Sequence, residues 1–250
     1  MSLRSVQRAT VFHSNPPHAG RMQWHPACTF LGEREKRRCG GKFPVYIPED
    51  RRYHKRRDGL GRMPGDGGMR VRLFIGILLP RAVRDSVAES ARLLEQHCAA
   101  GRFVPRENYH LTLAFLGEQP EGALETIWKG LDGCRCAPFP VTVGGFGAFE
   151  QRGGGVLWRG VEAPPALEAL QGELKRRLAG AGIGLEDRPF RPHLTLARRA
   201  RLMAGVSLEA LSAGVERPAF SVDGLALMRS HLSEAGARYT CLGQVEFKML

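Results

Sequence analysis

From residue 71 onward, hydrophobic and polar positions follow patterns that predict strands and amphipathic helices. A mostly apolar run over 71–79 predicts a strand that ends before Pro80. Apolar residues at every third or fourth position then predict a helix over 81–100, which Gly101 stops. Leucines at helical spacing predict another helix after Pro164 and Pro165. The remaining predicted elements are strands at 109–116, 141–149, 156–161, 193–198, 220–229 and 238–247, and helices at 121–131 and near 207–213.

One pentamer, His-Leu-Thr-Leu-Ala, occurs twice inside these predicted strands, at His110–Ala114 and at His193–Ala197. Side chains alternate between the two faces of a strand, so His and Thr two positions apart share one face while the leucines share the other. Each copy can therefore present a proton-transfer group and a hydroxyl on an open face while its leucines enter a core.

The repeated pentamer and the order of the predicted elements together indicate the fold class. Strands and helices alternate, and the two copies lie in separate parts of the chain. We expect an α+β fold of two pseudo-symmetric lobes over residues 69–250, each a small antiparallel sheet backed by helices. The two motifs are expected to face a central cleft between the lobes.

Residues 1–68 differ from the rest of the chain. They contain 14 Lys and Arg against six Asp and Glu, and they show no sustained strand or helix period. Such a composition buries too little apolar surface to offset chain entropy, so we expect a basic, disordered extension. It could increase affinity for RNA, or act as an organelle-targeting segment. A third interpretation places the natural start near Met69, which runs directly into the first predicted strand.

The overall composition excludes some classes of protein. The chain has 250 residues, a net charge of +12 and 43% hydrophobic residues, with no apolar run long enough to span a membrane. Its six cysteines do not have the spacing of a disulfide framework, which favours reduced thiols and a cytoplasmic protein. Two weak metal signals remain, and we expect neither to bind a metal: the Cys134-x-Cys136 pair, and the group His25, Cys28, Cys39 and His54.

Two histidines that converge on one cleft suit acid–base catalysis. An unperturbed pKa near 6.5 lets one imidazole accept a proton while the other donates one near pH 7. The hydroxyls of Thr112 and Thr195 can hydrogen-bond an anion, and Arg198 can contact phosphate oxygens. A single His-x-Thr would more simply be a structural pair, and His110 with His193 could in principle ligate zinc. No third ligand stands beside either motif, so two copies favour hydrolysis of a phosphate-bearing substrate without a metal.

These residues resemble the two-histidine (HxTx) phosphoesterase superfamily, and more narrowly the RNA 2′,3′-cyclic phosphodiesterases, also called 2′-5′ RNA ligases. The likeness runs from Met69 to about Phe247. Residues 1–68 have no counterpart in that family. The matching segments are Arg72–Ile75, Asn108–Glu118, Phe190–Arg198 and Leu227–Leu232, with Gly236 and Tyr239.

The resemblance implies hydrolysis of a 2′,3′-cyclic phosphate at an RNA end to a 2′-phosphomonoester, with no metal and no cofactor. It implies that His110 is the proton donor, that His193 is the proton acceptor, and that Thr112 and Thr195 hold the phosphate. Arg198 is expected as a further phosphate contact. Phe190 could stack on the terminal base or belong to the core.

Several alternatives remain open from the sequence. The chain could join RNA ends through a 2′-5′ linkage, or hydrolyse a small cyclic nucleotide. A non-enzymatic alternative is a module that binds RNA ends. We expect a monomer that contacts RNA or a cyclic-phosphate nucleotide and no membrane.

Overall fold

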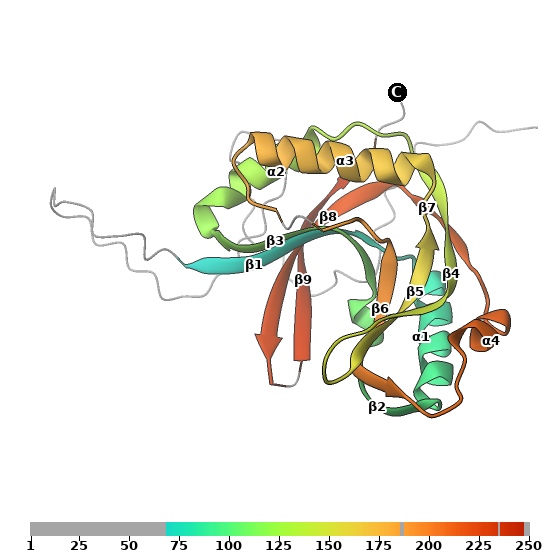
Figure 1. Ribbon diagram of the computed structural model, residues 1–250. Coiled ribbons are helices and arrows are strands. Elements are labelled where there is room, and N and C mark those ends of the chain that lie inside the picture. The colour runs from blue at the N-terminus through green and yellow to red at the C-terminus, as the bar shows by residue number, and fades with distance from the viewer. Residues whose placement is uncertain (1–68, 186–187, 235, 248–250) are drawn as a thin grey trace, which may run out of the picture. The chain divides into compact units, whose positions relative to one another are not determined.

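Two antiparallel sheets organise the part of the chain that the structure, a computed structural model, describes: residues 69–185, 188–234 and 236–247 (Figure 1). The first sheet has the strand order β3 (His110–Pro120), β1 (Arg70–Leu78), β8 (Gly224–Ser233), β9 (Gly236–Glu246). The second sheet has the order β2 (Cys98–Phe103), β6 (His193–Leu202), β5 (Gly155–Glu162), β4 (Phe139–Phe149), β7 (Ala219–Val222). These sheets, with the helices that cover them, confirm the expected α+β class.

Two helices each pack against the sheet that does not contain the strand before them. α1 (Arg81–Glu95) follows β1 of the first sheet, yet its Ser90 hydroxyl accepts a hydrogen bond from Arg159 on β5 of the second sheet, at 2.8 Å. α3 (Pro165–Gly180) follows β5, yet Gln171 on this helix donates to the Leu113 carbonyl on β3 of the first sheet, at 3.3 Å. Each sheet is thus backed by a helix that comes directly after a strand of the other sheet. This exchange links the two sheets through the chain itself.

Shorter elements complete the described fold. α2 (Leu124–Asp132) packs against α3, where Gly130 leaves only enough space for the Leu178 side chain. α4 (Leu208–Ala213) begins at Ser207, whose hydroxyl accepts from the Ala210 amide at 3.2 Å and so caps the helix. Two 3₁₀ turns precede β3 and α2, at η2 (Arg106–Asn108) and η3 (Glu121–Ala123).

The core forms where the predicted hydrophobic stripes meet. The inward face of α1 and the leucine stripe of α3 are buried, as the sequence predicts. The four leucines of the repeated pentamers are also buried, with at most 3% of their surface exposed: Leu111, Leu113, Leu194 and Leu196. These leucines fix which face of each strand turns away from the core, and therefore where His and Thr point.

Two sequence predictions are corrected by the structure. The helix predicted over 81–100 ends at Glu95, and the next residues form β2, in which Cys98 pairs with Leu202 of β6. An apolar residue such as Cys98 is compatible with both a buried helix face and a strand. The strand forms here because β6 offers an edge with which it can pair. The single strand predicted over 220–229 is two strands, β7 and β8, which separate at Asp223 because they belong to different sheets.

Candidate active site

The two repeated pentamers begin β3 and β6, one in each sheet. Both have the same burial pattern: His and Thr are half-buried, and the following leucines are buried. On β1, Leu78 lies opposite His110 and Gly76 lies opposite Thr112. On β5, Gly160 lies opposite His193. The alternation predicted from the sequence is therefore confirmed in both copies.

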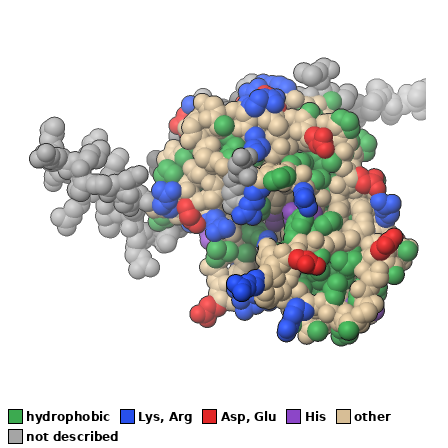
Figure 2. All heavy atoms as spheres, in the orientation of Figure 1, with side chains coloured by type: hydrophobic (Ala, Val, Ile, Leu, Met, Phe, Trp, Pro, Cys, Tyr) green, Lys and Arg blue, Asp and Glu red, His purple; other side chains and the backbone are tan. Residues whose placement is uncertain are grey.

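The structure brings the two histidines close enough for their charges to interact. A positive charge on His193 lowers the pKa of His110, and the charge of Arg198 lowers the pKa of both rings. Figure 2 shows histidine side chains inside a recess of the molecular surface, with hydrophobic and Lys or Arg side chains around it. The two motifs, from separate sheets, thus form one site.

Each imidazole is held by the same hydrogen bond. Nδ1 of His110 lies 2.7 Å from the carbonyl oxygen of Asn108, and Nδ1 of His193 lies 2.6 Å from that of Arg191. A carbonyl can only accept, so Nδ1 carries the proton in both neutral rings. Nε2 is then the unprotonated nitrogen of each ring, and it is the atom that can accept or donate a proton in catalysis.

Asn108 also holds the first motif in place. Its side-chain nitrogen donates to the carbonyl of Ala237 on β9 at 2.8 Å, and the residue is 8% exposed. One residue therefore orients the His110 ring through its carbonyl and ties the start of β3 to β9 through its side chain. No separate sequence signal indicates this role, although Asn108 belongs to the segment that carried the family resemblance.

Aromatic side chains flank both histidines. The Phe74 ring centroid lies 4.6 Å from that of His110, and Tyr239 meets His110 edge-on at 5.1 Å. Phe149 meets His193 edge-on at 5.0 Å, and the Trp158 ring lies 6.1 Å away. Sequence reasoning did not single out Phe149 or Trp158. Trp158 lies on β5, which pairs with the motif strand β6, and Phe149 lies on β4, one strand further, so only the strand order and register reveal them.

Burial by these rings determines the charge state of the histidines. Burial lowers the pKa of His110 to about 4, with smaller lowering by Arg198 and His193, while the hydrogen bond to the Asn108 carbonyl raises it. Burial also lowers the pKa of His193, followed by the charge of Arg198, against a raising hydrogen bond to Arg191. Both rings are therefore neutral near pH 7 in the free protein. A nearby anion would favour the protonated form of either ring.

A match to a family model covers both repeated motifs. The model describes the 2′-5′ RNA ligase superfamily and matches residues 79–234, which include both motif strands. The chain belongs to this superfamily.

Curated relatives of this superfamily member support the same grouping. An RNA 2′,3′-cyclic phosphodiesterase from Methanothermobacter thermautotrophicus is 35% identical over 179 residues, covering 69% of this chain and 96% of that protein. One from Thermus thermophilus is 35% identical over 187 residues, covering 69% of this chain and 88% of that protein. One from Geobacillus stearothermophilus is 29% identical over 169 residues, covering 66% of this chain. The match spans 54% of the Geobacillus protein, about half its length.

Among solved structures, Escherichia coli LigT complexed with 3′-AMP is similar in fold, with a TM-score of 0.60 and 29% identity. The match covers 72% of this chain and 100% of LigT. TT0787 of Thermus thermophilus has a TM-score of 0.57 and 30% identity, covering 70% of this chain and 97% of that chain. The fold of this chain is therefore similar to that of these solved structures.

The remaining predicted site residues have different surroundings. Thr112 and Thr195 are half-buried beside their histidines, and Arg198 is exposed on β6 while its charge reaches both rings. Phe190 is half-buried and packs against the main hydrophobic core. This packing favours the core interpretation of Phe190 over base stacking.

The predicted weak metal signals gain no support where the structure describes them. Cys134 is buried and its thiol donates to the Gly130 carbonyl, and burial raises the pKa of both Cys134 and Cys136. Across residues 69–185, 188–234 and 236–247, no three His, Cys, Asp or Glu side chains are grouped so as to hold a metal ion. The group His25, Cys28, Cys39 and His54 lies outside the described residues. Among described helices, none is long and apolar enough to cross a membrane.

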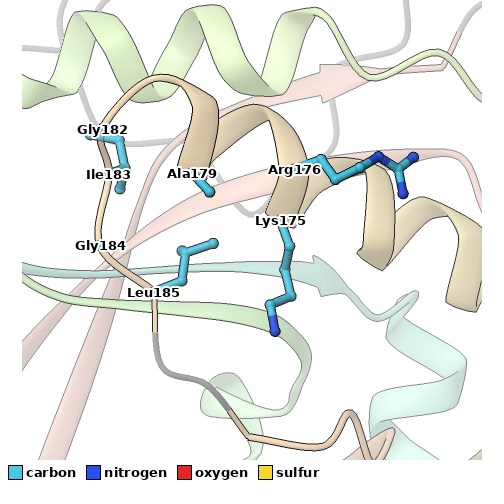
Figure 3. Close-up of a pocket in the computed structure, with 7 residues that line it drawn as sticks. All are labelled: Lys175, Arg176, Ala179, Gly182, Ile183, Gly184 and Leu185. Atoms are coloured by element: carbon cyan, nitrogen blue, oxygen red, sulfur yellow. The ribbon is translucent and has the colours of Figure 1, made fainter.

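A separate recess of about 550 Å³ lies at the end of α3 (Figure 3). The side chains of Lys175 and Leu185 lie at this recess, and Arg176 extends away from them. Its lining contains no residue of either repeated motif and no aromatic ring that contacts His110 or His193. It therefore adds nothing to the chemistry of the paired motifs.

Proposed function

We propose that the chain hydrolyses the 2′,3′-cyclic phosphate at an RNA end and leaves a 2′-phosphomonoester. The observation that carries this proposal is the pair of half-buried imidazoles, each with Nδ1 held by a carbonyl and Nε2 available for proton transfer. The names of the curated relatives support the same substrate. The proposed setting is the cytoplasm, with the protein acting as a monomer.

The proposed reaction is an in-line displacement at phosphorus. His193 accepts a proton from water through Nε2, and the water oxygen forms a new bond to phosphorus. The bond between phosphorus and the 3′ oxygen breaks, and His110 donates its Nε2 proton to that oxygen. Atoms and charge balance without a metal or cofactor, and each proton transfer contributes about 10²- to 10⁴-fold to the rate.

The two threonines and Arg198 position the phosphate between the rings. A hydroxyl from each motif donates to a non-bridging oxygen, and the guanidinium of Arg198 offsets the negative charge that develops there. The same phosphate counteracts the burial of His110. Its negative charge cancels the effect of Arg198 and favours the protonated ring, which the donor role requires.

A product assay tests this proposal. An oligonucleotide that ends in a 2′,3′-cyclic phosphate is incubated with the protein, with and without a chelator, and the product end is identified by mass spectrometry and phosphatase sensitivity. We expect a 2′-phosphate at the same rate in both samples. A 3′-phosphate, a joined product or an unchanged substrate would each contradict the proposal, and a chelator-sensitive rate would contradict its metal-independent mechanism.

A further inference from the structure

A second recess, of about 210 Å³, lies where β1 begins, and it contains none of the motif residues. Three arginines and a histidine contribute to its walls, against one acidic side chain. The lining residues that matter here are Arg70, Arg72, Glu118, Arg229, Ser230 and His231. We call these six residues the basic recess.

Register places the basic recess on the same face of the first sheet as the catalytic histidine. Leu78 lies opposite His110, and residues 76, 74, 72 and 70 follow on the same face of β1, because side chains alternate along a strand. Arg72 lies opposite Glu118 on β3 and opposite Ser230 on β8. One face of β1 therefore carries both the side chains beside the site and those of the recess, with the buried residues Phe74 and Gly76 between them.

The side chains between the two are apolar, and those on β1 and β8 are buried. Phe74, which contacts His110, packs with Met228 and Ala226 in a small cluster separate from the main core. Beyond it Phe115 is 43% exposed, and its ring centroid lies 6.2 Å from that of Phe74. An exposed aromatic ring between a phosphate site and a basic recess is the combination that single-stranded nucleic acid uses, with stacking on the ring and ionic contacts to the backbone.

The arginines of the recess are available for a ligand. The Arg70 guanidinium donates to the Glu118 backbone carbonyl at 2.7 Å, which leaves its charge unneutralised. Within the described residues, Arg70, Arg72 and Arg229 form no ion pair with a carboxylate. In Figure 2, Lys and Arg side chains gather on the side of the histidine-containing recess where the chain enters β1. Among the described residues, the recess therefore has more positive than negative charge, with Glu118 as its one acidic side chain.

The distance between the paired motifs and the basic recess determines which part of an RNA could contact the arginines of the recess. Gly76, opposite Thr112, and Arg72 are four residues apart, which is about 13 Å of extended strand. That distance exceeds the size of the terminal nucleotide whose cyclic phosphate sits at Thr112. Because that phosphate ends the strand, the rest of an RNA can extend only from its 5′ side.

We propose that the basic recess binds backbone phosphates of single-stranded RNA, upstream of the terminal nucleotide held at the paired motifs. This inference rests on the proposed function, since it places the cyclic phosphate at Thr112 and Thr195. It adds a second binding site, which would hold the strand beyond the terminal nucleotide and so distinguish an RNA end from a cyclic mononucleotide. Phe115 supplies a stacking surface along the path.

The experiment compares two substrates and three variants of the full chain. The substrates are a cytidine 2′,3′-cyclic monophosphate and a tetranucleotide with the same cyclic end. The variants are Arg72→Gln, Glu118→Gln and, as a matched charge control, Arg92→Gln on the exposed face of α1. Turnover is measured for both substrates. Affinity for a labelled tetranucleotide that ends in a 2′-phosphate is measured by anisotropy at several salt concentrations.

Losing one charged phosphate contact lowers affinity about tenfold. It also reduces the slope of log affinity against log salt by about 0.7 for a single strand. We expect Arg72→Gln to show both effects on the tetranucleotide and to hydrolyse the mononucleotide like the wild type. Glu118→Gln removes the opposing charge and should tighten binding of the tetranucleotide. Arg92→Gln should change neither the turnover of the two substrates nor the affinity for the tetranucleotide.

The outcomes separate this proposal from the function on which it rests. Equal loss on both substrates in Arg72→Gln would show a structural role, and an unchanged salt slope would show that no phosphate is bound there. Either result overturns the proposal. If the wild type hydrolyses neither substrate but binds the tetranucleotide with an Arg72-dependent salt slope, the RNA path stands and the proposed reaction fails.

Discussion

The lowered pKa of His110 has a direct consequence for stability against acid. The ring has a pKa of about 4 in the folded protein, compared with a value near 6.5 in an unfolded chain. Below 6.5 the unfolded chain therefore binds a proton that the folded protein does not, and stability falls as the pH falls. A shift of this size corresponds to about 3 kcal/mol, lost mostly between pH 6.5 and pH 4.

Urea unfolding at steps from pH 7.5 to pH 4 measures this loss for the wild type and for His110→Asn. The variant lacks the titrating ring, so we expect it to lose about 3 kcal/mol less than the wild type across this window. The comparison removes contributions common to both proteins, including those of His193 and of surface carboxylates. Parallel curves for the two proteins would refute the claim that burial keeps His110 neutral.

Three further predictions follow from the same contacts. Binding of cytidine 2′-phosphate should raise the pKa of His110, because the negative charge of the phosphate opposes the effect of burial. Nitrogen-15 NMR of the imidazole measures this pKa, and an unchanged value would show that the phosphate does not bind beside the ring. Gly147→Ala places a Cβ against the Trp158 ring, so we expect the indole to move and turnover to fall, while circular dichroism shows the fold unchanged. Arg159→Met removes a buried cation that donates to Ser90 and two carbonyls, and we expect a loss of about 3 kcal/mol in urea unfolding, with wild-type stability as the contradicting result.

The chemistry of the site could be predicted from the sequence because it depends on local alternation. His110 and Thr112 share a face in any strand, and burial of Leu111 and Leu113 determines which face that is. The second copy obeys the same rule. The prediction that the two strands belong to different sheets depends on the duplication rather than on alternation, and the structure confirms it.

The failures of sequence reasoning have the opposite cause, because they depend on partners distant in the chain. Residues 98–100 continue a helical pattern, but pairing with β6 makes them part of a strand. The run over 220–229 predicts one strand, but the chain leaves one sheet and enters the other at Asp223, so two strands form. The ring of Trp158 and the basic recess around Arg72 likewise follow from register, which no local pattern contains.

The roles of the two histidines are the central claim, and a change of leaving group tests them most directly. In a cyclic substrate whose 3′ oxygen is replaced by sulfur, the departing thiolate needs no proton, since a thiol has a pKa near 8.5. We predict that His110→Ala has little activity on the oxygen substrate but recovers most of the wild-type rate on the sulfur substrate. His193→Ala should stay inactive on both substrates. Recovery of His193→Ala instead would reverse the roles, and recovery of neither would contradict paired acid–base catalysis.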